Sequence, residues 1–359
     1  MSGALRIPGR RWPWFAVPVA VAVASRAYSL AILGALSLVP GMRSGLPAVW
    51  DAAWYLRIAG TGYHAWVVGG GHDFAFFPAW PLLVKVASLG VLPTALVGTA
   101  LANALFVAAA ALIWRVLDER LGREAATGGV ALLSFAPPAY VFSLPYSEPL
   151  FLVAAAVYFG AGAASRWRVA AAALAMFARI SGAAIVASAL TRAALSRGRE
   201  RRASLAAAAG GVIAFAIWWG FIAHLTGQLT GFLHGSPSWA GGASGLARIE
   251  VALARPTISR LVWLAFLGIM TAGAVGLIRA DLELAVFSVA ALALALLPGG
   301  IVSSMPRYAL AAFPAFAGLA LLARRLDRRL VVALAVVFAA GQVLFAAWAM
   351  TAPPLGAAP

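Results

Sequence analysis

The sequence contains no cysteine. This absence excludes disulfide bonds and thiolate metal sites, so the only side chains available to ligate a metal are carboxylates and four histidines. Charge is also scarce, because charged residues make up 11% of the 359 positions and lysine occurs only at position 85. Neither a G-x-x-x-x-G-K-[ST] loop nor a dinucleotide-binding G-x-G-x-x-G following a strand is present. The sequence therefore gives no support to nucleotide hydrolysis or to a site for a soluble nucleotide sugar.

Apolar side chains, by contrast, are abundant. Hydrophobic residues make up 63% of the chain, and the mean hydropathy is +0.93, which is typical of a polytopic membrane protein. The formal net charge of +16 comes from short basic clusters between apolar runs, a pattern typical of membrane topology signals rather than nucleic-acid binding. We expect an integral membrane protein without a nucleic-acid partner. The preference for Arg over Lys, with much Ala and Gly, indicates a bacterial source with a GC-rich genome.

Nine apolar runs are long enough to cross a hydrocarbon core, which takes roughly 20 helical residues. They lie near 14–39, 94–114, 125–143, 147–164, 203–223, 258–278, 284–302, 307–323 and 330–350. The positive-inside rule then places eighteen arginines on the cytoplasmic side and five outside, with the N-terminus cytoplasmic and the first run an uncleaved span. We expect an all-α, polytopic transmembrane bundle of about 9 to 11 spans, forming a single integral membrane domain over residues 1–359 of a bacterial plasma membrane protein.

One further apolar segment, residues 168–191, lies between two basic clusters that both have cytoplasmic character. We interpret it as two half-helices that meet at the sequence ARISG and return to the cytoplasmic side. Such a break at membrane depth is tolerated where it is packed in protein or lines a cavity. The alternative is an ordinary span, which would place one basic cluster outside.

Two loops fall on the extracytoplasmic side, residues 40–93 and 224–257, so we expect any chemistry to face outward. The first loop contains FAFFPAWPLL, an aromatic and proline-broken piece that we place at the membrane interface, although a crossing by residues 79–92 stays open. The second loop is rich in Gly and Ser, which predicts a flexible segment or a lid.

The first loop begins with VWDAAWYLRIAGTGY, in which Asp51 is surrounded by aromatic residues. In a helix starting here, Asp51 and Tyr55 share one face, while Trp50 and Trp54 share another, which suits a helix at the membrane interface. Two interpretations of Asp51 stay open. It caps the helix with its carboxylate, or it takes a proton from an acceptor hydroxyl at the membrane surface.

Five stretches, WDAAWYLRIAGTGY, FAFFPAWPLL, PYSEPLFL, ARISG and SMPRYALAAFP, resemble in order the landmarks of the PIG-V-type mannosyltransferase family. That family belongs to the C-type (GT-C) membrane glycosyltransferases, which use polyprenyl-phosphate sugars. The resemblance implies a GT-C-like helical bundle with juxtamembrane helices in the first extracytoplasmic loop. It also implies that Asp51 is the catalytic carboxylate of an inverting transfer that requires no metal. Ser181 stands where the family often has Asn or Thr, so no role is carried over to that side chain.

Arginines inside apolar segments are costly and are retained for a partner or a pathway. Arg179 and Arg307 are the best candidates to bind the donor phosphate, because a guanidinium binds phosphate oxygens bidentately. The alternatives are a structural ion pair for Arg179 and extension to the outer interface for Arg307. Arg26 and Lys85 are expected to be packing or interfacial residues.

Other polar residues near the outer face complete the candidate substrate site. Glu148 and Tyr146 lie at the outer end of a predicted hairpin, where Glu148 binds acceptor hydroxyls, pairs with an arginine, or caps the helix that follows. His72 and Asp73 adjoin FAFFP and are candidates to assist Asp51. We expect no cofactor requirement; a divalent cation at His72 and Asp73 is an alternative that no recognised metal motif supports.

Together these patterns predict a transferase that moves mannose, or a related hexose, from a polyprenyl-phosphate donor to a lipid, glycan or protein acceptor outside the membrane. Asp51 would act as the base, Arg179 and Arg307 would hold the phosphate, and Trp50, Trp54 and Tyr55 would line the sugar site. The alternatives are a transporter or lipid flippase without transferase activity, which predicts functional residues near the midplane, and a scaffold subunit.

Overall fold

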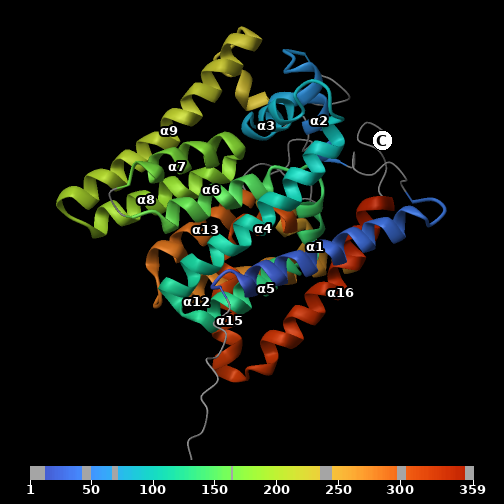
Figure 1. Ribbon diagram of the computed structural model, residues 1–359, viewed down its shortest axis with the longest axis vertical. Helices are drawn as coiled ribbons and strands as arrows, with labels where there is room; N and C mark the ends of the chain where they lie inside the picture. Colours follow the sequence, from blue (N-terminus) through green and yellow to red (C-terminus); the bar gives the residue numbers. More distant parts are fainter. Residues whose placement is uncertain are drawn as a thin grey trace, which may run out of the picture.

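The computed structural model describes residues 13–42, 50–66, 72–162, 165–234, 245–296 and 305–351 (Figure 1). Throughout these ranges the secondary structure is helical and contains no strand, which confirms the predicted all-α class. The α-helices are α1 (Ala16–Ser37), α2 (Asp51–Thr61), α3 (Ala79–Ala87), α4 (Thr94–Leu121), α5 (Arg123–Ser134), α6 (Glu148–Gly160), α7 (Arg166–Ala178), α8 (Ala183–Leu195), α9 (Gly198–Thr226), α11 (Gly245–Ala254), α12 (Ile258–Gly276), α13 (Leu282–Leu296), α14 (Met305–Tyr308), α15 (Phe313–Leu326) and α16 (Arg329–Thr351). Short 3-10 helices are η1 (Asp73–Ala75), η2 (Pro137–Ser143), η3 (Ile180–Gly182), η4 (Gly231–His234) and η5 (Ala309–Ala311).

Four described helices, α1, α4, α9 and α16, are each long and apolar enough to cross a membrane. A fifth candidate is α5 with η2, which is bent by 78°. The remaining predicted spans contain shorter helices, such as α6 with 13 residues and α15 with 14. The predicted number of spans is therefore not confirmed, because these helices are shorter than the roughly 20 residues that a full crossing takes.

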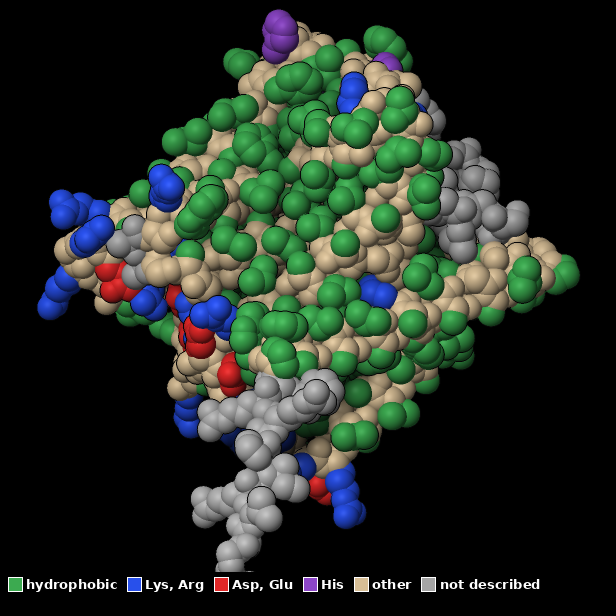
Figure 2. Space-filling model, in the orientation of Figure 1, with side chains coloured by type: hydrophobic (Ala, Val, Ile, Leu, Met, Phe, Trp, Pro, Cys, Tyr) green, Lys and Arg blue, Asp and Glu red, His purple; other side chains and the backbone are tan. Residues whose placement is uncertain are grey.

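Charged side chains gather at one end of the molecule. Figure 2 shows acidic and basic residues over the ends of α8, α9 and α15, while hydrophobic side chains cover the broad face across α4 and α6. Helices α2 and α3 lie toward the opposite end of the bundle, near the C-terminal end of α9 (Figure 1). Such a separation of a charged end from an apolar belt is typical of membrane proteins.

The segment between the two basic clusters forms the predicted pair of half-helices, α7 and α8, joined by η3. Arg168 near the start of α7 and Arg192 near the end of α8 both contact Glu283, so the chain returns to the side from which it entered. At the break, a Cβ on Gly182 would lie 2.4 Å from the Cα of Met176, so only glycine permits this close turn. We call α7, η3 and α8 the half-helix hairpin.

The first predicted outer loop contains α2, η1 and α3, as expected for juxtamembrane helices. Helix α3 has nine residues and is about 14 Å long, too short to cross the membrane. In the second predicted loop, α9 extends to Thr226 and is followed by η4 and α11. The Gly- and Ser-rich stretch 235–244, predicted to be flexible or a lid, lies outside the described residues.

Arg26 has the packing role expected from the sequence. Its guanidinium donates to the carbonyl oxygens of Ala139 and Ser134, at 3.0 and 3.2 Å, and to Ser143 Oγ at 2.9 Å. It also lies 4.4 Å from the ring centroid of Phe106. Because α5 ends at Ser134 and its carbonyls lose their helical partners there, Arg26 satisfies the backbone at the bend between α5 and η2.

Candidate active site

Four side chains of alternating charge form a chain of ion pairs where several helix ends meet. Asp51 pairs with Arg307, and Arg307 Nε lies 3.4 Å from Glu148 Oε1. The same Glu148 oxygen lies 2.5 Å from Arg179 Nη1. These residues come from distant parts of the sequence, since Asp51 and Arg307 are 256 positions apart. The structure thus brings together the candidate base, both candidate phosphate-binding arginines and Glu148.

Each of the four side chains is placed by a helix end. Asp51 and Glu148 are the first residues of α2 and α6, where the positive end of the helix dipole favours a carboxylate. Arg179 follows the last residue of α7 in an extended conformation, and Arg307 belongs to the short helix α14. Local sequence therefore places a charge at each end, and the packing of the helices brings those ends together.

The capping interpretations of the two carboxylates are not observed. Neither α2 nor α6 has a side-chain capping hydrogen bond at its N-terminus, and both carboxylates contact arginine instead. Arg307 is 8% exposed, so it does not extend to the interface. Arg179 is also buried at 8% exposure. Both arginines are thus committed to the interior cluster.

Aromatic rings and a hydroxyl pair support the arginines. The guanidinium carbon of Arg307 lies 4.9 Å from the ring centroid of Tyr146 and 4.8 Å from that of Tyr308. The hydroxyl of Tyr55 is 2.8 Å from Ser147 Oγ, which also accepts a hydrogen bond from Arg179 at 3.3 Å. Burial, reinforced by the nearby Glu148 and Asp51 and opposed by Arg179, raises the pKa of the Tyr55 hydroxyl far above its usual value. That hydroxyl therefore stays protonated and orients Ser147 beside Arg179.

A small, partly open pocket adjoins the ion pairs. Its lining residues come from the start of α2, η2 and the turn after it, α14 and α16: Trp50, Asp51, Pro138, Tyr140, Val141, Tyr146, Arg307, Phe345, Trp348 and Ala349. The side chain of Asp51 is 22% exposed and is the carboxylate that lines this pocket. A carboxylate and a guanidinium thus face a space bounded largely by apolar and aromatic groups.

The wall from α16 was not anticipated from the sequence. Trp50 stacks on Trp348 with ring centroids 5.9 Å apart and donates from Nε1 to the carbonyl oxygen of Ala349 at 2.8 Å. These contacts hold Trp50 at a φ of 57°, which a non-glycine residue rarely adopts. The only sequence signal was an aromatic residue near the end of the last apolar run, typical of the membrane interface.

Trp54, His72 and Asp73, which were also predicted to bind substrate, do not line this pocket. Trp54 stacks on Phe76 with ring centroids 5.6 Å apart, and the guanidinium carbon of Arg57 lies 4.1 Å from the Trp54 ring centroid.

Asp73 is fully buried and organises the loop itself. Its carboxylate accepts hydrogen bonds from the backbone NH of His64, at 3.0 Å, and pairs with His64 Nδ1 at 2.9 Å. His72 stacks on Phe74, and partial burial lowers its pKa, with His234 adding to the effect and Asp73 opposing it. Within the described ranges, no group of three or more His, Asp or Glu residues is arranged to hold a metal ion. The expectation that no cofactor is needed stays a prediction.

A sequence model of the family described as mannosyltransferase (PIG-V) matches residues 36–196. The matched segment is slightly less than half of the chain, and it is similar to the PIG-V mannosyltransferase family. The matched segment contains Asp51, Glu148 and Arg179, while Arg307 lies outside it. The comparison with curated proteins found no match.

Solved structures with similar folds are membrane glycosyltransferases. The crystal structure of ArnT from Cupriavidus metallidurans bound to undecaprenyl phosphate has a TM-score of 0.55 and 14% identity; the match covers 92% of this chain and 76% of ArnT. The oligosaccharyltransferase of Archaeoglobus fulgidus, in complex with Zn and sulfate, has a TM-score of 0.53 and 12% identity, with 92% of this chain and 53% of that one covered. The same archaeal enzyme, named AglB, in complex with an inhibitory peptide and a dolichol-phosphate gives a TM-score of 0.51.

These matches establish the GT-C fold of the chain. The chain spans about three quarters of ArnT but only about half of the archaeal enzyme. Together with the family match and the apolar helices, the fold supports a membrane glycosyltransferase.

Proposed function

We propose that the protein transfers mannose, or a related hexose, from a polyprenyl-phosphate donor to an extracytoplasmic acceptor, with inversion at the anomeric carbon. The observation that carries the proposal is the position of Glu148 Oε1, which contacts both Arg179 and Arg307. Two guanidinium groups directed at one anionic oxygen form a site that suits a phosphate group. The match to the mannosyltransferase family model supports mannose as the sugar. The ArnT structure bound to undecaprenyl phosphate supports a polyprenyl-phosphate carrier.

In this mechanism Asp51 is the general base. The acceptor oxygen forms a bond to the anomeric carbon, its proton moves to Asp51, and the bond from that carbon to the phosphate oxygen breaks. The electron pair stays on the phosphate, which changes from a monoanionic diester to a dianionic monoester. Arg179 and Arg307 stabilise this added charge. Direct displacement converts a β-linked donor into an α-linked product.

The ion pair between Asp51 and Arg307 gives donor binding a second effect. While Arg307 holds Asp51, the carboxylate is engaged with a cation and is not free to contact the acceptor hydroxyl. A donor phosphate that takes over the Arg307 guanidinium leaves Asp51 free for the acceptor hydroxyl. The donor therefore binds before the acceptor becomes reactive.

The pocket beside α16 fits the lipid part of this scheme. Phe345 and Trp348 give the pocket an apolar wall. In the apolar stretch of α16 only 17% of the residues are buried within the protein, so most of this helix faces outward. We propose that the isoprenoid chain leaves the site along α16, with the sugar at Asp51. In this proposal the N-terminus is cytoplasmic, the site faces the outside of a bacterial plasma membrane, and the acceptor is a lipid, a glycan or a protein.

Transfer from a labelled donor tests the proposal. Membranes containing the protein are incubated with polyprenyl-phosphate [¹⁴C]mannose, and the label is followed into lipid, glycan and protein fractions, with membranes lacking the protein as the control. We expect label in one of these fractions, in α linkage. Movement of the labelled lipid between leaflets without any transfer of the sugar would instead support the flippase alternative and exclude the proposed reaction.

A further inference from the structure

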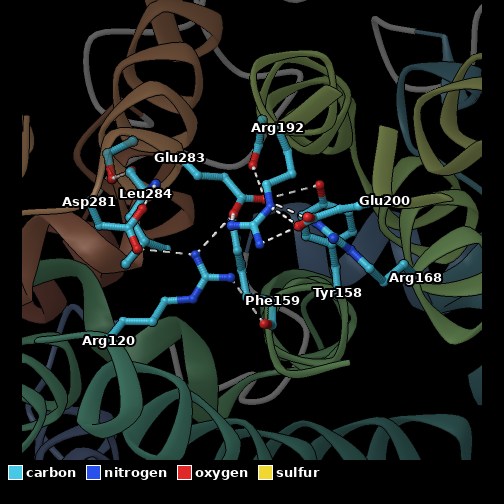
Figure 3. Close-up of polar contacts among 11 residues, drawn as sticks. Arg120, Tyr158, Phe159, Arg168, Arg192, Glu200, Asp281, Glu283 and Leu284 are labelled. Carbon is cyan, nitrogen blue, oxygen red and sulfur yellow. Dashed lines mark hydrogen bonds and ion pairs between the residues drawn. The ribbon is translucent and has the colours of Figure 1, made fainter. Parts of the chain in front are cut away.

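A second charged cluster lies at the opposite ends of the helices that carry the candidate site, and Glu283 is its centre (Figure 3). Glu283 Oε1 accepts hydrogen bonds from Arg168 at 3.0 Å and from Tyr158 and Ser188 at 3.3 Å. Its Oε2 contacts Arg120 at 3.0 Å and Arg192 at 3.5 Å. The Glu283 side chain is 3% exposed. One buried carboxylate therefore contacts five other side chains.

The partners of Glu283 come from the helices that place the site. Tyr158 lies near the end of α6, the helix that begins with Glu148. Arg168 and Arg192 lie at the two open ends of the half-helix hairpin, whose tip carries Arg179. Ten residues of helix separate Tyr158 from Glu148, or about 15 Å. Glu283 thus fixes one end of the same elements that hold Glu148 and Arg179 at the other.

The half-helix hairpin is held in place at both its base and its tip. Both arms are tied to one carboxylate, so they cannot separate or slide past one another without breaking a contact to Glu283. At the tip, the NH of Arg179 bonds the carbonyl oxygen of Ala175, and the NH of Gly182 bonds the carbonyl oxygen of Arg179. Gly182 packs so closely against α7 that the turn has no room to shift toward this helix.

Stability alone is a weak reason for such a cluster. Burying a carboxylate with several arginines costs desolvation, and well-packed apolar residues often stabilise a fold equally well. Buried ionic groups can instead specify one geometry among several similar packings. A guanidinium that must receive a phosphate needs such a fixed position, because small displacements of a catalytic group are costly.

We propose that Glu283 is a positioning residue that acts through the half-helix hairpin to set the place of Arg179 in the donor-phosphate site. The proposal rests on the proposed function, in which Arg179 binds the donor phosphate. Glu283 itself does not contact the site, and its effect passes through the paired arms of the hairpin.

Binding of undecaprenyl phosphate to the purified full chain, in nanodiscs of phosphatidylcholine, tests this role. We expect Glu283→Gln to weaken binding about tenfold, whereas Glu119→Gln, the same substitution in an exposed ion pair on α4, leaves it unchanged. The deciding measurement is a double-mutant cycle with Arg179→Gln. If Glu283 acts through Arg179, then Glu283→Gln lowers affinity less than twofold in the Arg179→Gln background.

Other results would overturn the proposal. A tenfold loss in both backgrounds would mean that Glu283 acts independently of Arg179, and unchanged binding by folded Glu283→Gln would mean that it has no positioning role. If Glu283→Gln does not fold, Arg168→Gln removes the tether of α7 alone and should show the same dependence on Arg179. If the wild-type protein binds no undecaprenyl phosphate, the proposed function fails together with the role of Glu283. If the wild-type protein binds this lipid but the double-mutant cycle shows no dependence on Arg179, only the role of Glu283 fails.

Discussion

Asp51 and Arg307 form an ion pair at the wall of the pocket, and Arg307 simultaneously contacts Glu148. One guanidinium therefore links the carboxylate that lines the pocket to the buried carboxylate behind it. An anion that attracts Arg307 therefore weakens the ion pairs of this arginine with both Asp51 and Glu148.

Replacing Asp51 by Asn should separate catalysis from binding. We expect Asp51→Asn to lower the rate of mannose transfer by roughly 10²- to 10⁴-fold, because the amide cannot accept the acceptor's proton. Binding of undecaprenyl phosphate should be retained, because Arg307 loses a competing carboxylate. The measurements are radiolabel transfer and lipid binding. The matched control is Asp118→Asn, near the C-terminal end of α4. Full transfer by folded Asp51→Asn protein would exclude Asp51 as the base.

A lysine at position 307 should not replace the arginine. The lysine ammonium is a single point charge, whereas the guanidinium of Arg307 reaches both Asp51 and Glu148 through different nitrogens. We expect Arg307→Lys to lower kcat/KM for the polyprenyl-phosphate donor by roughly 10²-fold. Arg115→Lys, in an exposed pair with Glu119, should have no effect on this measurement. Equal kcat/KM values for Arg307→Lys and wild type would show that only the charge is needed.

Neutralising Glu148 should strengthen binding of a free phosphate. If Oε1 of Glu148 occupies the position of a phosphate oxygen, Glu148→Gln removes an anion that competes for Arg179 and Arg307. We expect tighter binding of undecaprenyl phosphate together with slower transfer, since both arginines lose the partner that orders them. Glu124→Gln, in an exposed ion pair with Arg324, is the control. Weaker phosphate binding by Glu148→Gln would place the phosphate elsewhere.

The break in the half-helix hairpin should not tolerate a methyl group. A Cβ at position 182 would lie 2.4 Å from Met176 Cα and 2.5 Å from Met176 N, so Gly182→Ala must open the turn that presents Arg179. We expect donor KM to rise at least tenfold. Gly220 on α9 has nothing within 4 Å of its Cβ position, so Gly220→Ala should behave like wild type. An unchanged donor KM in Gly182→Ala would show that the turn does not control donor binding by Arg179.

Arg26 should matter for stability rather than for chemistry. Arg26→Met leaves the carbonyl oxygens of Ala139 and Ser134 without this donor at the bend after α5. An unsatisfied buried carbonyl costs about 1–3 kcal/mol, so we expect a loss of about 2–6 kcal/mol for the pair. The thermal unfolding midpoint should fall, while donor KM in the protein that remains folded stays unchanged. An unaltered midpoint would mean that other donors replace Arg26.

Much of the candidate site could be inferred from residue type and depth. Arg179 and Arg307 stood out because a charge in an apolar run needs a partner, and Glu148 stood out as an acid near the outer face. Trp54 was assigned to the same site as an aromatic residue of the helix that begins at Asp51, and His72 and Asp73 because they adjoin FAFFP. In the structure Trp54 stacks on Phe76 and Asp73 is buried against His64, and neither residue lines the pocket beside Asp51.

The sequence by itself determined the helical class, the positions of the apolar helices and the break at ARISG, because hydropathy, helix length and glycine act over a few neighbouring residues. Only the tertiary structure decided that Arg307 reaches Asp51, that α16 forms a wall of the pocket, and that Glu283 joins the base of the hairpin. Those contacts depend on which helix ends meet after packing, and ion pairs between such ends leave no local pattern in the chain.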